Sequence, residues 1–229
     1  MKILALKPSL AEQVYEVIVA GICDGDLPAG AHLVQEQLAE QLGVSRQPIQ
    51  QAMALLKADG MVEEIGRRGL CVAALDPALM RHHYDIRATL DGLAARLSAL
   101  RLAAAPGLAK SFSDRAAQIL EAGQAAVSSG EVAGQVRHDM ALHTLIYETS
   151  GNPLLARTAE PHWRFLRRAM GEVLRRATLP REIWRQHAEI VEAIARGDAQ
   201  GAEALMVHHD LSAAGTLQAA LEAMEAASA

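Results

Sequence analysis

Residues 38–53 read LAEQLGVSRQPIQQAM, and this stretch decides how the first part of the chain folds. Gly43 breaks a helical pattern, and Ser45 is a residue type that favours the N-cap of a new helix. Behind Ser45, apolar residues such as Ile49 and Ala52 recur at the spacing of a helix with one buried face. Two helices joined by a tight glycine turn form a helix-turn-helix.

The residues before this stretch predict the first two helices. Ser9 and Glu12 form a capping box at the start of a helical pattern that covers about residues 9–24. Turn-forming residues follow over Asp24–Gly30, and the helical pattern returns over Val34–Leu42. The helix that begins at Ser45 is therefore the third.

The residues after the third helix predict a β-hairpin. Beyond Gly60, which is suited to end the helix, Met61–Ile65 and Leu70–Ala73 have the pattern of two short strands. The connection Gly66–Gly69 has a glycine at each end and two arginines between them. Three helices followed by a two-stranded wing make a winged helix-turn-helix, which we assign to residues 1–75 as one domain.

The chain changes character at Asp76-Pro77. From there on, residues rich in alanine, leucine and arginine follow a helical pattern with almost no strand-like alternation. We predict a mainly α protein, in which an antiparallel bundle of about six helices over residues 77–229 follows the winged helix-turn-helix. The expected breaks between these helices are Ala105–Gly107, Ser128–Gly130, Gly151–Pro153, Leu179-Pro180 and Gly197-Asp198.

The composition excludes several protein classes. Hydrophobic residues make up 51% of the 229 residues but aromatic residues only 3%, which is typical of an alanine-rich helical protein. No apolar run approaches the roughly 20 residues that a membrane span needs. Cys23 and Cys71 are too few for a disulfide scaffold and lack the spacing of a metal site. We therefore expect a soluble cytoplasmic protein with reduced thiols and no membrane partner.

The start of the third helix carries side chains that can read DNA. In a helix-turn-helix, the second helix lies in the major groove with its N-terminal residues at the base edges. Arg46 can there pair with guanine through two hydrogen bonds, and Gln47, Gln50 and Gln51 can contact adenine or phosphate. Ser45 can cap the helix and contact a phosphate. The motif thus predicts sequence-specific binding to double-stranded DNA.

The charge of the chain predicts only a weak non-specific attraction to DNA. The net charge is −5, and residues 1–76 contain six basic against ten acidic residues. Arg67 and Arg68 nevertheless lie together at the wing tip, where they can contact phosphates or enter the minor groove. The alternative is that these arginines form only a solvated turn, and that a glycine turn between two helices is a common feature.

The N-terminal residues resemble a known superfamily of bacterial regulators. The chain is similar to the GntR superfamily, and this resemblance implies a DNA-binding transcription regulator rather than an enzyme. One departure concerns Gln50 and Gln51, where the family usually has arginine and commonly glutamate, and it implies a different operator preference. The segments that carry the resemblance are Leu27–Gly30, Leu38–Arg46, Pro48-Ile49 and the wing from Gly60 to Gly69.

Four residues in the C-terminal half have the spacing of a metal site. Asp139 and His143 are four residues apart and therefore share one helix face. His187 and His209 each lie about 10 to 11 residues from the Gly197-Asp198 turn, so an antiparallel helix pair brings them to similar heights. One carboxylate and three imidazoles suit Zn²⁺ or Ni²⁺ and leave coordination positions open. The alternative is chance clustering, because the chain contains nine histidines.

Most of residues 77–220 resemble the FCD effector domain of the FadR branch, and the number of bundle helices looks closer to the VanR-like subgroup. The resemblance implies that the same four residues hold a divalent metal ion. His138 and His208 adjoin two of them, so a register shifted by one residue stays open. The resemblance further implies a homodimer that binds a palindromic operator and senses a small organic acid.

Arg87 is the residue that the resemblance assigns to the effector. It matches an arginine near the start of the FCD domain, which implies contact with an acidic ligand. Asp91 stands where the family usually has glutamate. A salt bridge between helices is the alternative function of this arginine.

Three functions compete for the C-terminal bundle. The first is control of a DNA-binding repressor by a carboxylate metabolite bound near the metal. The second is a metal-dependent hydrolase, but no general base pairs with the metal site, and catalysis leaves the wing and Ser45-Arg46 unexplained. The third is a purely structural dimerisation module.

Overall fold

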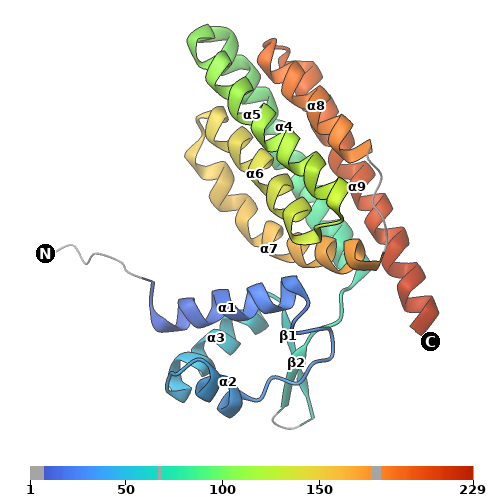
Figure 1. Cartoon of the computed structure of the whole chain (residues 1–229). Helices are drawn as coiled ribbons and strands as arrows, with labels where there is room; N and C mark the ends of the chain where they lie inside the picture. Colours follow the sequence, from blue (N-terminus) through green and yellow to red (C-terminus); the bar gives the residue numbers. More distant parts are fainter. Residues whose placement is uncertain (1–7, 67–68, 177–181, 229) are drawn as a thin grey trace, which may run out of the picture. The chain divides into compact units, whose positions relative to one another are not determined.

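The chain consists of two compact units in the computed structural model (Figure 1). The structure describes residues 8–66, 69–176 and 182–228. The first unit is Met1–Leu75 and the second is Asp76–Ala229. None of the helices in these described ranges has both the length and the apolar character of a membrane span.

The first unit contains three helices within the described residues, α1 Leu10–Asp24, α2 Gln35–Gln41 and α3 Arg46–Ala58. The predicted capping box starts α1: the backbone N–H of Glu12 donates to the Ser9 hydroxyl, and the N–H of Ser9 donates to the Glu12 carboxylate. Gly43 has a φ of 64°, a conformation in which glycine turns the chain from α2 into α3 without steric strain. The predicted helix-turn-helix is confirmed.

The predicted hairpin follows α3. Its strands β1 Val62–Ile65 and β2 Gly69–Val72 pair in antiparallel orientation. β1 begins one residue later than expected, and β2 lies one residue earlier than expected. His32 forms an additional isolated bridge to Cys71, which fastens the segment between α1 and α2 to the hairpin. The core of this unit combines apolar side chains of the helices and the hairpin, including Val14, Ile18, Ile22, Ile49, Met53, Leu56, Val62 and Val72.

The second unit is a bundle of six helices within the described residues, as predicted (Figure 1). The carboxylate of Asp76 caps the first of them by accepting hydrogen bonds from the N–H groups of Ala78 and Leu79. The expected break at Leu179-Pro180 lies outside the described residues, and the other four expected breaks separate successive helices. The helices are α4 Pro77–Ala104, α5 Pro106–Ser129, α6 Val132–Ser150, α7 Pro153–Arg176, α8 Glu182–Ala195 and α9 Ala199–Ser228.

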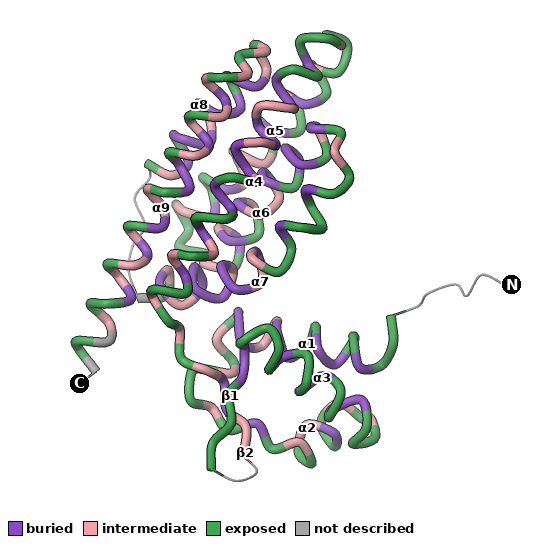
Figure 2. The backbone as a smooth tube through the Cα atoms, turned by 180° about the vertical axis from the view of Figure 1, so that it is seen from behind, coloured by how far each residue is buried: buried purple, intermediate pink, exposed green. Residues whose placement is uncertain are grey.

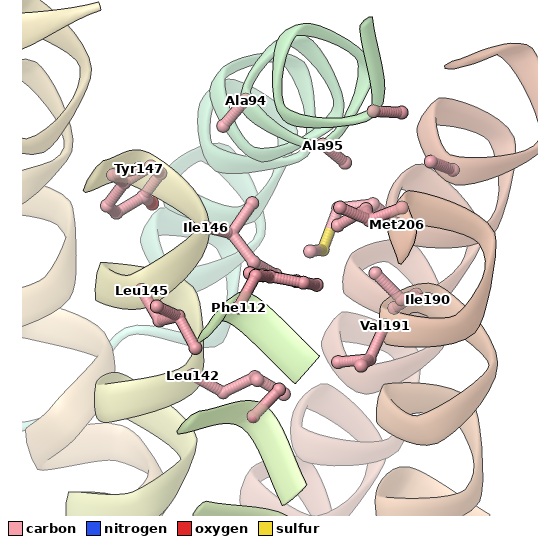
Figure 3. Packing of buried hydrophobic residues seen from close by; sticks show 14 of the residues in the cluster. Ala94, Ala95, Phe112, Leu142, Leu145, Ile146, Tyr147, Ile190, Val191 and Met206 are labelled. Atoms are coloured by element: carbon pink, nitrogen blue, oxygen red, sulfur yellow. The ribbon is translucent and has the colours of Figure 1, made fainter. Parts of the chain in front are cut away.

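The core of the bundle combines small residues on α4 with larger ones on its neighbours (Figure 3). Ala94 and Ala95 are fully buried on α4, which packs against α6, α7, α8 and α9. Phe112, Leu142 and Ile146 fill the space that these small side chains leave. Buried and exposed segments alternate along the helices (Figure 2), and the same packing brings one face each of α6, α8 and α9 together.

Candidate metal centre and nucleic-acid interface

Asp139 and His143 on α6, His187 on α8 and His209 on α9 converge in the interior of the bundle. One ligand atom of each lies within 4.8 Å of one ligand atom of every other. All four side chains are buried, with His187 at 0% and Asp139 at 5% exposure. His138 is half-buried and His208 is exposed, so the geometry favours the predicted register over one shifted by a residue.

The distances within this cluster fit a divalent ion. His187 Nε2 lies 3.1 Å from His209 Nε2 and 3.3 Å from Asp139 Oδ1. Ligand atoms about 2.0–2.2 Å from a tetrahedral ion are roughly 3.3 Å apart. The second carboxylate oxygen of Asp139 is buried and has no hydrogen-bond partner among the described residues. A cation between these atoms would satisfy both the facing nitrogens and the carboxylate.

The protonation states also fit ligation. Burial lowers the pKa of His209 well below its ordinary value, and the neighbouring His187 and His143 lower it further, so its imidazole is neutral. Burial alone would raise the pKa of Asp139, but the hydrogen bond with His187 and the nearby His143 lower it, so Asp139 is a carboxylate. Metal ions bind these forms of histidine and aspartate.

Gln186 fixes the orientation of one histidine in the cluster. Its side-chain oxygen lies 3.0 Å from His209 Nδ1, so this nitrogen carries the proton and donates it to Gln186. The other ring nitrogen, Nε2, then presents a lone pair to the cluster. Such outer hydrogen bonds orient metal-binding imidazoles and tune their affinity.

Arg87 lies in a buried network next to the cluster. Its Nε donates to Asp91 at 2.9 Å, and its guanidinium lies 3.3 Å from Asp210 Oδ1. The guanidinium also stacks on Trp163, 3.7 Å from the ring centroid. Since Asp210 belongs to α9, this arginine makes the contact between helices that the sequence left open as the alternative to effector contact. Burial and the nearby Asp91 and Asp139 raise the pKa of Asp210 well above its ordinary value, so Asp91 is the charged partner of Arg87.

The Arg87 network is linked directly to the cluster through His143. An Arg87 NH2 nitrogen lies 2.9 Å from His143 Nε2, and Asp91 Oδ2 lies 2.9 Å from His143 Nδ1. Asp91 also accepts a hydrogen bond from Tyr147. His143 would hold an ion through the same Nε2 that now faces the guanidinium, so ion binding would be coupled to the position of Arg87.

A small cavity adjoins both features. It measures about 20 Å³, and its walls include Arg87, Asp139 and His209. A cavity of this size holds about one water molecule. It therefore gives a small group access to the side of the cluster that Arg87 also faces.

The predicted DNA-reading side chains share one end of α3. Ser45, Arg46, Gln47, Gln50 and Gln51 are all exposed, while the intervening Pro48 and Ile49 are buried. Ser45 occupies the predicted N-cap position of α3, although its hydroxyl makes no capping hydrogen bond to the described residues. The Arg46 side chain pairs with Glu36 of α2 and is 65% exposed. Arg67 and Arg68 of the wing lie outside the described residues.

Family models match both units. The model described as "Bacterial regulatory proteins, gntR family" matches residues 10–72, and the model "FCD domain" matches residues 82–212. The chain is a GntR-family regulator with an FCD domain. Its curated relatives are transcription regulators and not enzymes, so the hydrolase alternative does not apply to this regulator.

Two relatives illustrate the extent of the similarity. The regulator is 27% identical over 206 residues to a probable D-xylose utilization operon transcriptional repressor of Paenarthrobacter nicotinovorans. This match covers 89% of this chain and 86% of the relative. It is 36% identical over 81 residues to an HTH-type transcriptional regulator in the TAR-I ttuE-ttuC' intergenic region of Agrobacterium vitis. That second match covers 35% of this chain and 47% of the relative, so it spans about half of the relative's length.

Solved structures share the fold of this GntR-family regulator. Escherichia coli McbR/YncC superposes with a TM-score of 0.75 at 21% identity, covering 92% of this chain and 98% of that one. A GntR regulator of Rhodococcus sp. RHA1 gives a TM-score of 0.74 at 18% identity with the same coverage. The arrangement of a winged helix-turn-helix and a helical bundle is therefore common to all three.

The regulator has a second histidine pair outside the cluster. His83 on α4 and His162 on α7 approach to 2.9 Å between their Nδ1 atoms, and the His83 ring stacks on Phe165 at 4.3 Å. Burial, together with the charges of His162 and His82, lowers the pKa of His83 to about 4 from its ordinary 6.5. His83 is thus neutral in the folded protein over a range in which the unfolded chain protonates it.

We expect the metal-free regulator to lose stability as the pH falls from about 6.5 toward 4. The folded pKa of His83 lies below the unfolded one, so the unfolded state binds the extra proton in this window. Urea unfolding at about pH 7.5 and 5 measures the loss, which should be smaller in His83→Leu than in the exposed control His82→Leu. Part of the loss remains because the pKa of His143, His162 and His209 is lowered as well. Equal losses in both variants would contradict the assignment to His83.

Proposed function

We propose that this regulator is a repressor that binds a palindromic operator as a homodimer and responds to a small carboxylate metabolite at a metal-containing site in its second unit. The observation that carries this proposal is the convergence of Asp139, His143, His187 and His209 from three helices. The match to a relative named as a probable repressor supports repression over activation.

The four converging side chains would hold the ion, and Zn²⁺ or Ni²⁺ suits three imidazoles and one carboxylate. When bound, the ion supplies a Lewis-acidic centre with open positions for a carboxylate oxygen. Gln186 would keep His209 oriented toward it. Arg87 would sense the occupied state, because it contacts His143 and lines the cavity beside Asp139.

The exposed N-terminal end of α3 would contact the operator. Arg46 would read guanine, and Gln47, Gln50 and Gln51 would contact adenine or the phosphates. Ser45 would contact a phosphate, because its hydroxyl makes no capping hydrogen bond among the described residues. Arg67 and Arg68 would reach phosphates or the minor groove from the wing.

We expect Arg46→Ala to weaken specific operator binding by about 1–3 kcal/mol and to relax the preference at one base pair. The truncated side chain loses the two hydrogen bonds to one guanine. An operator selected from random duplexes and fluorescence anisotropy give the affinity. The matched control is Arg115→Ala, which removes another exposed, carboxylate-paired arginine, here from the second unit. Equal affinities of Arg46→Ala and the control would refute the assignment.

The coupling between the two sites is the test of the proposed function as a whole. A ligand changes the DNA affinity only if it binds the two states of the protein differently. We expect a panel of small organic acids to contain at least one that releases the selected operator from the metal-loaded protein. The same acid should not release it from His187→Ala. The proposal would be contradicted if an acid released the operator from the wild type and from His187→Ala at the same concentration. It would also be contradicted if no acid in the panel released the operator from either protein.

A further inference from the structure

A second cavity lies between α5 and α8, and Trp184 but none of the four metal-cluster residues lines it. It measures about 380 Å³ and is lined by Gln124, Val127, Ser128, Trp184, Arg185 and Ala188. This volume lies within the range of roughly 300–1,000 Å³ typical of small-molecule sites. We call it the outer cavity.

Shared lining residues link the outer cavity to the metal cluster through two smaller cavities. Trp184 and Val127 line both the outer cavity and a middle cavity of about 30 Å³. Asp139, Met170 and Ile183 line both this middle cavity and the inner cavity of about 20 Å³. Three cavities thus lead from the α5–α8 surface to Asp139, separated only by side chains.

The inner and middle cavities are too small for an organic acid. Each holds about one water molecule, so a ligand with a body larger than its carboxylate needs further space. The outer cavity offers that space. A ligand whose head reaches Asp139 would therefore extend past Trp184.

Trp184 forms the partition between the two ends of this path. Its indole meets the His187 ring edge to face at 5.1 Å on the cluster side. On the other side it lies against Gly123 of α5, so closely that a Cβ at this position would overlap the ring. The ring can thus close the path only because residue 123 is glycine.

The lining of the outer cavity indicates which part of a ligand it accepts. Val127, Ala188 and the indole of Trp184 form apolar walls. The guanidinium of Arg185 pairs with Glu182 and Glu189, so its charge is already compensated. Gln124 and Ser128 add polar groups that can hydrogen-bond to a ring substituent. The outer cavity is therefore suited to a flat body that stacks on an indole and carries a polar substituent.

We infer that the effector is an aromatic carboxylic acid whose ring occupies the outer cavity while its carboxylate reaches the metal cluster, and that Trp184 is the gate between the two. This inference rests on the proposed function for the carboxylate end. None of the residues that line the outer cavity belongs to the metal cluster, so the two ends can be tested separately.

The first test uses 2-naphthoate as the probe and 5-fluorotryptophan in the full chain. The protein contains two tryptophans, Trp163 and Trp184, so ¹⁹F NMR gives one signal for each, assigned with Trp184→Phe. We expect 2-naphthoate to shift the Trp184 signal saturably, also in metal-free protein. Ala188→Leu on α8 should weaken this binding at least ~10-fold by filling the cavity, while Ala125→Leu, at an exposed position of the other wall helix α5, should not.

The second test measures how fast EDTA removes Co²⁺ from the Co²⁺-loaded protein. The visible absorbance of the protein-bound Co²⁺ decreases as the ion is released. Gly123→Ala displaces the Trp184 ring. This variant should release Co²⁺ at least ~10-fold faster, because the passage to the metal cluster is then no longer closed by the indole. The control Gly215→Ala adds the same methyl group where nothing lies within 4 Å, and should release Co²⁺ like the wild type.

The outcomes separate this inference from the proposed function. No saturable shift of Trp184, or equal binding by Ala188→Leu and Ala125→Leu, would overturn the outer cavity as a ligand site. Equal Co²⁺ release from Gly123→Ala and Gly215→Ala would overturn the gate. If the wild type binds no Co²⁺ but 2-naphthoate still shifts Trp184, the proposed metal site fails while the outer cavity stands.

Discussion

Replacing His209 by alanine is expected to lower the affinity for Zn²⁺ or Ni²⁺ at least ~100-fold, because it removes one of four protein ligands. Metal analysis of the purified protein should then fall from about one ion per chain to almost none. The neighbouring His208→Ala is the matched control, since His208 is exposed one residue away. Gln186→Ala should lie between the two, with a loss of about 10- to 100-fold, because it removes only the hydrogen bond that orients His209.

This result discriminates between the functions left open for the bundle. Retention of a full ion by His209→Ala, or an equal loss in His208→Ala, would show that the ion is held elsewhere. Absence of any ion from protein purified without chelators, together with no uptake of added Zn²⁺ or Ni²⁺, would favour a purely structural bundle.

The second large effect is expected for Arg87→Met, which should lower the free energy of unfolding by about 3–5 kcal/mol. Arg87 and Asp91 are 2% and 0% exposed, so the substitution leaves a buried carboxylate without its cation. Burial would raise the pKa of Asp91, but Arg87 and His143 lower it, so the folded protein holds this group charged. Urea unfolding of the metal-free protein measures the loss.

A matched control and a compensating variant sharpen this prediction. Arg81 pairs with Asp85 on the same helix at the same four-residue spacing, but both are more than 40% exposed. Arg81→Met should therefore cost at most about 0.5 kcal/mol. The double variant Arg87→Met with Asp91→Leu should recover part of the stability, because Asp91 is then no longer an unpaired buried charge, while Asp210 and His143 still lack their partners. Equal losses in Arg87→Met and Arg81→Met would show that the buried pair does not carry the expected energy.

Local patterns made the first unit predictable. The reciprocal capping by Ser9 and Glu12, the turn at Gly43 and the change of period after Gly60 each depend on residues close in sequence. The residue type of Ser45 predicted the N-cap position of α3 but not the side-chain rotamer, which makes no capping hydrogen bond among the described residues. The bridge between His32 and Cys71 joins distant segments and leaves no periodic signal.

The candidate metal centre could be predicted in part for the same reason. Asp139 and His143 share a helix face, and His187 and His209 flank a turn at equal distances, so local geometry suffices to bring each pair together. The surroundings of Arg87 could not be predicted. Asp210 and Trp163 contact Arg87, and Tyr147 contacts its partner Asp91, from three different helices. Only the packing of the bundle determines which of these side chains meet.

The most direct test of the metal centre is anomalous diffraction from crystals of the full chain, purified without chelators, at the absorption edge of the bound ion. One peak per chain should lie among Asp139, His143, His187 and His209, at about 2.0–2.2 Å from the ligand atoms. A map without such a peak, or with its peak between His83 and His162, would contradict the account.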